Sequence, residues 1–122
     1  MRPKSGGPVE TGSLREGLPA EPQAEELVDI LMERPGLRME RIVSTGQVTA
    51  EDQWYDQAWD EFVVVVSGAA RVRIEGEADD RAMQAGDWIV LPAHCRHRVT
   101  WTQSTPPTVW FAVHYKDSPS GV

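Results

Sequence analysis

Glu61 and His97 are among the residues of this sequence whose side chains can perform acid–base or metal chemistry. If both are buried, each needs a partner, because an isolated charge is costly in an apolar interior. They can pair with each other, with pKa values shifted by burial, or share a divalent metal ion. Tyr55 and Gln57 lie an even number of residues before Glu61, so all three share a face if one strand runs unbroken between them.

The segments that must position these residues have the patterns of β-strands. Residues 61–68 form an apolar run of strand length, and residues 70–76 alternate between apolar and charged side chains. Further strands are predicted over residues 37–44, 88–91, 97–102 and 108–115. Short strands separated by turn residues predict an all-β sandwich or barrel.

The N-terminal part has a different character. Residues 1–22 contain four prolines and four glycines in a polar stretch, which predicts a flexible tail. Residues 24–33 place Leu27, Ile30 and Leu31 at the spacing of a short amphipathic helix, ended by Pro35. We therefore expect a tail over residues 1–22, one folded domain over 23–118 and a C-terminal tail over 119–122.

Two motifs carry a family resemblance. Glu61 is followed by Gly68, and a second motif runs from Gly86-Asp87 through Pro92 to His97. They resemble the two motifs of the cupin superfamily, the first with two histidines, a glutamate and a glycine, the second with glycine-aspartate, proline, glycine and histidine. The resemblance covers about residues 37–115. It implies the cupin double-stranded β-helix, a jelly-roll barrel, with a central pocket. The short helix predicted over residues 24–33 precedes this barrel.

The departures from the cupin pattern concern the metal site. Tyr55 and Gln57 stand where cupins usually have the two motif-one histidines, and His94 replaces the motif-two glycine. The usual set of three histidines and one glutamate is therefore reduced to Glu61 and His97. The resemblance implies a site of Gln57, Glu61, His97 and His94 for a divalent ion such as Mn, Fe, Ni or Zn. The alternative is a pocket without a metal, in which Glu61 and His97 pair with Tyr55.

Several candidate residues have two interpretations. Tyr55 is either a proton donor that contacts the substrate or an aromatic barrel residue whose hydroxyl finds a partner. Gln57 is either a metal ligand or a pocket-lining amide, and His94 either a ligand or a solvated loop residue. His114 is either a substrate-binding residue or a core histidine. Trp101 is expected, from its parity on the strand, to form a wall of the substrate pocket.

The composition of the chain argues against two classes of partner. The 122 residues carry a net charge of −7, which argues against a nucleic-acid partner, because phosphate binding needs a basic surface. No apolar run approaches the roughly 20 residues that span a bilayer, and the N-terminus lacks the apolar segment of a secretory signal. We therefore expect a cytoplasmic protein with neither a nucleic-acid nor a membrane partner. The resemblance to cupins implies a small-molecule ligand and a homodimer.

The sequence leaves the activity open. One hypothesis is a metal-dependent enzyme that acts on a small acid or sugar-like metabolite, with Tyr55 and Glu61 as catalytic residues. The alternative is a metal-free binding or sensing module, which the missing motif-one histidines and the five tryptophans favour. The sequence shows no phosphate-binding loop, redox-cofactor fingerprint or serine triad. It does not identify the substrate or the reaction.

Overall fold

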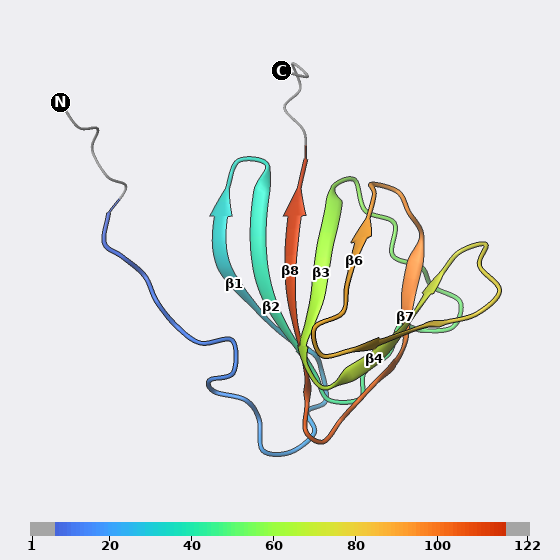
Figure 1. The fold of residues 1–122 in the computed structure, drawn as a ribbon, viewed down its shortest axis with the longest axis horizontal. Coiled ribbons are helices and arrows are strands. Elements are labelled where there is room, and N and C mark those ends of the chain that lie inside the picture. Colours follow the sequence, from blue (N-terminus) through green and yellow to red (C-terminus); the bar gives the residue numbers. More distant parts are fainter. Residues whose placement is uncertain (1–6, 117–122) are drawn as a thin grey trace.

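The computed structural model describes residues 7–116, which form eight β-strands in two antiparallel sheets (Figure 1). The strands are β1 (Leu27–Arg34), β2 (Leu37–Ser44), β3 (Asp60–Ser67), β4 (Ala69–Ile74), β5 (Arg81–Gln84), β6 (Trp88–Leu91), β7 (His97–Thr102) and β8 (Thr108–Tyr115). Their order is β1-β2-β8-β3-β6 in one sheet and β5-β4-β7 in the other. Within the described residues there is no helix that could cross a membrane. The sheets enclose a pocket between them, as the predicted jelly-roll barrel requires.

Alternation along the strands decides which side chains point between the sheets. On β3, Val63 and Val65 are buried, whereas Phe62 and Val64 are only half-buried on the outer side. The buried apolar residues of both sheets form one core, which consists of Val63, Val65, Ala70, Val72, Met83, Leu91, Trp110 and Ala112. A continuous apolar run such as that of β3 is typical of a strand covered on both sides, but in the single chain only its inner row is fully covered.

The register of β8 aligns polar residues on the inner face of the five-stranded sheet. β8 lies between β2 and β3, and its His114 is opposite Arg38 on β2 and Glu61 on β3. Side chains directly opposite each other in such a ladder lie close enough to interact. The backbone pairing therefore places an imidazole between a guanidinium and a carboxylate.

The helix predicted over residues 24–33 is wrong, because residues 27–34 form strand β1. β1 pairs antiparallel with β2, and Gly36 closes the turn between them with a positive φ of 75°. Val28 and Ile30 lie on one side of the strand, with Asp29 between them on the other, so part of the apolar set also fits the period of a strand. Pairing with β2 decides between the two periods, since tertiary context overrides a weak helix propensity.

The chain ends fall partly outside the described residues. Residues 1–6 and 117–122 are not described, and they include the start of the predicted tail over 1–22, the end of the predicted domain over 23–118 and the predicted tail over 119–122. Residues 7–22 contain no strand or helix. Nη1 of Arg41 donates hydrogen bonds to the backbone oxygens of Leu14 and Glu16, at 3.2 and 2.6 Å. These bonds tether the segment to β2.

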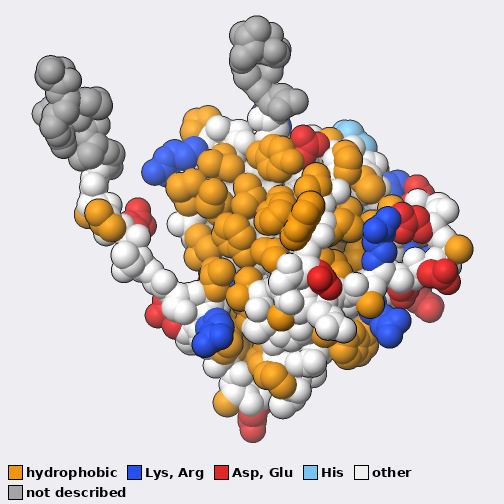
Figure 2. All heavy atoms as spheres, in the orientation of Figure 1, with side chains coloured by type: hydrophobic (Ala, Val, Ile, Leu, Met, Phe, Trp, Pro, Cys, Tyr) orange, Lys and Arg blue, Asp and Glu red, His pale blue; other side chains and the backbone are white. Residues whose placement is uncertain are grey.

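The outer face of the five-stranded sheet is rich in apolar side chains (Figure 2). We call Phe62, Val64, Trp88, Val90 and Phe111 the apolar outer face. They are cross-strand neighbours, because Phe62 is opposite Val90, and Val64 is opposite both Trp88 and Phe111. The side chain of Trp88 stacks on Phe62 with ring centroids 5.8 Å apart, yet Trp88 remains 63% exposed. In the single chain this face is therefore open to solvent.

Candidate functional site

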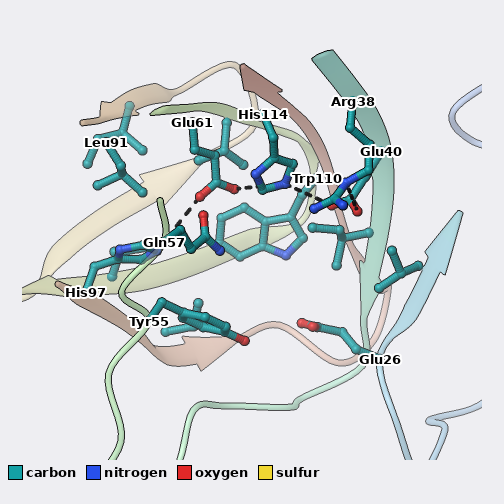
Figure 3. Close-up of a pocket in the computed structure, with 16 residues that line it drawn as sticks. Glu26, Arg38, Glu40, Tyr55, Gln57, Glu61, Leu91, His97, Trp110 and His114 are labelled. Carbon is teal, nitrogen blue, oxygen red and sulfur yellow. Dashed lines mark hydrogen bonds and ion pairs between the residues drawn. The ribbon is translucent and has the colours of Figure 1, made fainter. Parts of the chain in front are cut away.

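The pocket between the two sheets has a volume of about 240 Å³ and is lined by residues of both (Figure 3). Its polar lining residues are Glu26, Arg38, Glu40, Tyr55, Gln57, Glu61, His97 and His114. Its apolar lining residues are Val28, Ile42, Val63, Val72, Ile89, Leu91, Val99 and Trp110. A pocket that combines apolar walls with a few convergent polar groups has the usual composition of a small-molecule site.

Glu61 lies at the start of β3 and is buried, with 7% of its surface exposed. Its carboxylate receives no hydrogen bond from the described residues, and the nearest imidazole nitrogens, Nε2 of His97 and Nε2 of His114, both lie 3.9 Å away. Burial raises the pKa of Glu61, and the neighbouring imidazoles of His114 and then of His97 act in the opposite direction. A buried carboxyl group with free lone pairs facing a pocket is suited to proton transfer.

His97 begins β7 and is held in one orientation by two contacts. Nδ1 of His97 lies 2.9 Å from the backbone oxygen of Cys95. Because a carbonyl oxygen only accepts, Nδ1 carries the hydrogen, and in the neutral ring Nε2 is an acceptor that faces Glu61. The ring also stacks on Tyr55, with centroids 5.4 Å apart. Figure 3 shows His97 and Glu61 converging from opposite sheets.

His114 belongs to a second polar chain that starts on β2. Nε2 of His114 lies 3.0 Å from Oε1 of Glu40, and Oε2 of Glu40 lies 3.1 Å from Nε of Arg38. The second contact is an ion pair without the alignment of a hydrogen bond, because Nε of Arg38 has no hydrogen-bond partner among the described residues. Glu40 therefore fixes the ring of His114 beside Glu61, while Arg38 compensates the charge of Glu40.

Tyr55 and Gln57 reach the pocket from the connection between β2 and β3. The strand assumed to run from Tyr55 to Glu61 is interrupted, because β3 begins only at Asp60. Tyr55 is instead placed by a two-way backbone pair with His97, with N···O distances of 2.7 and 3.1 Å. Burial, followed by the negative charge of Glu26, raises the pKa of Tyr55, so its hydroxyl stays a hydrogen-bond donor.

His94 does not reach the pocket, contrary to the expectation that it could join a metal site. Its backbone has a positive φ of 63°, and its N–H donates to the backbone oxygen of Gln57 at 2.7 Å. The side chain is 69% exposed, and its Nδ1 lies 2.7 Å from Oδ1 of Asp56. This loop conformation turns the imidazole toward solvent, in agreement with the alternative interpretation of a solvated loop residue.

Trp101 is not a pocket wall either, although its parity on the strand predicts one. The pairing of β4 with β7 shifts register, so that Val72 is opposite Val99 but Arg71 is opposite Trp101. This bulge puts one extra residue, Thr100, into β7 and inverts the alternation beyond it. Val99 lines the pocket, whereas Trp101 is 44% exposed on the outer side.

The described residues do not fit the divalent metal site that the resemblance implies. No group of three or more His, Cys, Asp or Glu side chains within residues 7–116 is arranged to hold a metal ion. His94 points away, and Nε2 of His114 is engaged by Glu40. The remaining candidate set is Glu61, His97 and the neutral amide of Gln57, which is a weaker set than the imidazole-rich ones that such ions prefer.

The sequence patterns do not single out several lining residues, among them Glu26, Arg38, Glu40 and Trp110. A signal for two of them was present: on β2, Arg38 and Glu40 share parity with Ile42, so two charged residues lie on a face that also carries an apolar one. The sequence carries no such signal for Glu26, because its segment, residues 24–33, has the pattern of a helix. Trp110 was recognised only as one of five tryptophans.

Comparisons with known proteins identify the family. A family model described as a cupin domain matches residues 40–114, whereas no curated protein matches. A protein of Ralstonia eutropha JMP134, provisionally described as a mannose-6-phosphate isomerase, is 46% identical, with 89% of this chain and 100% of that chain covered and a TM-score of 0.86.

More distant structures share the fold. KdgF from a Halomonas species is 20% identical, with 82% of this chain and 88% of that chain covered and a TM-score of 0.64. A cupin superfamily protein of Desulfitobacterium hafniense DCB-2 is 14% identical, with 90% and 94% covered and a TM-score of 0.70. The family match, the barrel and the position of Glu61 and His97 inside it agree, and the chain belongs to the cupin superfamily.

Proposed function

We propose that this chain is an isomerase-type enzyme that moves a proton between neighbouring carbons of a small hydroxycarbonyl compound. The observation that carries the proposal is the carboxylate of Glu61, which is buried, faces the pocket and receives no hydrogen bond from the described residues. Its raised pKa makes it a stronger base than an ordinary carboxylate. The Ralstonia protein that is 46% identical is described as a sugar-phosphate isomerase, which supports the same reaction class.

Glu61 performs the proton transfer in this proposal. Its carboxylate removes the proton from the carbon beside the carbonyl group, and the electron pair moves to the carbonyl oxygen to give an enediolate. The hydroxyl proton passes to the other oxygen by way of Nε2 of His97. Glu61 then returns its proton to the former carbonyl carbon, so that the product is an isomer and no atom is gained or lost.

Tyr55 and Gln57 orient the substrate. The hydroxyl of Tyr55 stays protonated and donates a hydrogen bond to the oxygen on which negative charge develops, which is the most effective place for a donor. The amide of Gln57 can donate and accept, and so it can hold a substrate hydroxyl. Apolar side chains such as Leu91 and Val99 exclude water from the reacting carbons.

The test is exchange of carbon-bound hydrogen in D₂O, followed by NMR, with a panel of small aldoses and ketoses of three to six carbons. Wild-type protein is expected to exchange the proton beside the carbonyl of at least one compound. Glu61→Gln is expected to lose roughly 100-fold or more of that rate, the usual range for a general base. Glu51→Gln, a matched change at an exposed turn, serves as the control. Exchange that survives Glu61→Gln, or no exchange with any compound, would contradict the proposal.

The proposal assigns no step to a metal ion, because the donor set does not fit one. We therefore expect exchange to persist after treatment with a chelator and dialysis. Loss of exchange on chelation, restored by Mn, Fe, Ni or Zn, would favour the metal-dependent enzyme instead. A compound that raises the melting temperature without any exchange would favour the binding module, for which the apolar wall around Trp110 is the supporting feature.

A further inference from the structure

The charges around the pocket are mainly negative. Three carboxylates line it, Glu26, Glu40 and Glu61, and Arg38 is the one Lys or Arg among the described lining residues. Nε of Arg38 forms an ion pair with Glu40, and the Arg38 side chain is 39% exposed, so its charge is shared with that carboxylate and with water. With neutral imidazoles and ionised carboxyl groups, three negative charges and one positive charge leave the lining with a net charge of −2.

The other arginines near the barrel do not change this balance. Arg73 pairs with Asp80 at 3.0 Å and Arg96 pairs with Glu75 at 2.9 Å. Arg98 lies over the ring of Trp54, 5.2 Å from its centroid. None of these arginines lines the pocket. Their positive charges lie outside the pocket, where they interact with acidic or aromatic side chains.

A phosphate group finds one cationic partner among the described lining residues of this pocket, Arg38, and that side chain already forms an ion pair with Glu40. Phosphate sites in proteins are built from unpaired Arg or Lys side chains, from clusters of backbone N–H groups, or from helix N-termini. Residues 7–116 contain no helix, and the charge of the one guanidinium in the described lining is offset by Glu40, whose Oε2 lies 3.1 Å from Nε of Arg38. A phosphate dianion in the pocket would also lie near the carboxylates of Glu26, Glu40 and Glu61, and like charges repel each other.

Uncharged hydroxyl groups, in contrast, find complementary partners. Carboxylates accept hydrogen bonds from hydroxyls, Gln57 can donate and accept, and the faces of Tyr55 and Trp110 provide apolar surface for carbon-bound hydrogens. The volume of about 240 Å³ is smaller than the range of roughly 300–1,000 Å³ for drug-sized ligands. The pocket therefore suits a compact ligand.

We propose that the pocket selects an unphosphorylated, uncharged polyhydroxylated ligand and rejects its phosphate ester, with Glu26 as the main specificity-determining residue. This inference rests on the proposed function, because it names the substrate class of the same site. It separates this chain from the activity for which its Ralstonia relative is named, since that name specifies a phosphorylated sugar.

The experiment compares hexoses with their 6-phosphates by calorimetry at low and high salt. Aldohexoses and ketohexoses are each paired with their own 6-phosphate. Wild-type protein is expected to bind at least one free hexose, and to bind it roughly tenfold or more tightly than its ester. The difference should shrink at high salt, because screening weakens repulsion between partly exposed charges.

Charge variants locate the selectivity. Glu26→Gln is expected to reduce the preference for the free sugar, and Glu26→Lys to reduce it further or reverse it. Asp79→Lys makes the same charge change in the exposed turn between β4 and β5, and is expected to leave the preference unchanged. If Asp79→Lys changes it as much as Glu26→Lys does, net charge rather than the pocket decides, and the inference fails.

The inference and the proposed function fail in different ways. Equal or tighter binding of the phosphate esters, or no binding of any free hexose, overturns the inference. Proton exchange seen only with esters would keep the proposed function and overturn the inference. Selective binding of a free hexose without proton exchange would keep the inference and overturn the proposed function.

Discussion

The ring of His97 stacks on the ring of Tyr55, and the backbones of the same two residues exchange hydrogen bonds in both directions. This pair joins the connection between β2 and β3 to the start of β7. A residue on a connection is thereby positioned as firmly as one on a strand. The chemistry of the pocket depends on this pair, since Tyr55 supplies the hydroxyl and His97 the imidazole.

Removing the hydroxyl of Tyr55 separates its two roles. Tyr55→Phe keeps the stack with His97 but loses the donor, and we expect kcat/KM for proton exchange to fall roughly 100-fold with the melting temperature almost unchanged. Tyr55→Ala also loses the stack, so it should lower both the rate and the melting temperature. Equal activity of Tyr55→Phe and wild type would show that the hydroxyl does not act on the substrate.

Burial of Glu61 predicts a definite sign for the pH dependence of stability. Its folded-state pKa is raised, so the folded protein holds this proton more tightly than the unfolded chain does. The contribution of Glu61 to stability is therefore complete below its unfolded pKa and is lost as pH rises through the raised folded pKa. The groups that face Glu61 and modulate this pKa are His114, His97, Glu40 and Arg38.

Urea unfolding of wild type and Glu61→Gln across this pH range measures the effect. Glutamine carries no charge, so we expect the variant to gain stability relative to wild type as pH rises above the usual range for glutamate. The gain should level off above the folded pKa of Glu61. A difference between the two proteins that does not vary with pH would contradict the buried, perturbed carboxyl group.

Gly68 is required where β3 passes into β4. Its φ is 82°, and a Cβ atom there would lie 2.7 Å from Cα of Thr108 and 2.8 Å from the backbone oxygen of Pro107. We expect Gly68→Ala to cost about 2 kcal/mol or more in the free energy of unfolding, from backbone strain and collision together. Gly76→Ala isolates the strain, because Gly76 has a φ of 92° with no atom within 4 Å, and should cost about 1 kcal/mol.

The apolar outer face predicts that two copies of the chain associate. The chain carries a net charge of −7, so copies repel each other except where a surface is neutral. The apolar outer face has no charged member, and the neighbouring Arg41 and Asp29 neutralise each other at 2.6 Å. A second copy therefore approaches this face without an electrostatic penalty and buries an area that water contacts unfavourably.

Sedimentation velocity tests this association. Wild-type protein is expected to be a homodimer at micromolar concentration, and Trp88→Glu a monomer with an intact pocket. Trp101→Glu places the same charge on an exposed tryptophan of the other sheet and should remain dimeric. A wild-type monomer, or a dimer that Trp88→Glu leaves intact, would contradict the prediction.

The barrel could be predicted because the patterns that indicate its strands lie within short stretches of sequence. Residues 70–76 alternate cleanly, and the structure buries Ala70 and Val72 as that alternation requires. Glu61 and His97 could be placed inside because the resemblance fixes their strands. The error at β1 arose because its apolar residues fit two periods, and only the partner strand β2 selects one.

The errors within the site have a different cause. Trp101 was misplaced by one extra residue in β7, and parity arguments fail beyond any such bulge. Glu40 could not be linked to His114 because they are 74 residues apart in sequence. Such contacts depend on the order of strands in the sheet, which the spacing of residues along the chain does not specify.

The position of β1 has a kinetic consequence. β1 is an edge strand whose one ladder partner is β2, and it carries Val28 into the pocket lining, with Glu26 immediately before it. Strands bonded on one side open at a lower free energy than those in the middle of a sheet. Amide protons of β1 should exchange with solvent before those of β8. Ligand entry and release would then follow the fraying of β1. A mutation in the β1–β2 hairpin is therefore expected to alter the residence time of the ligand without changing the deep part of the pocket.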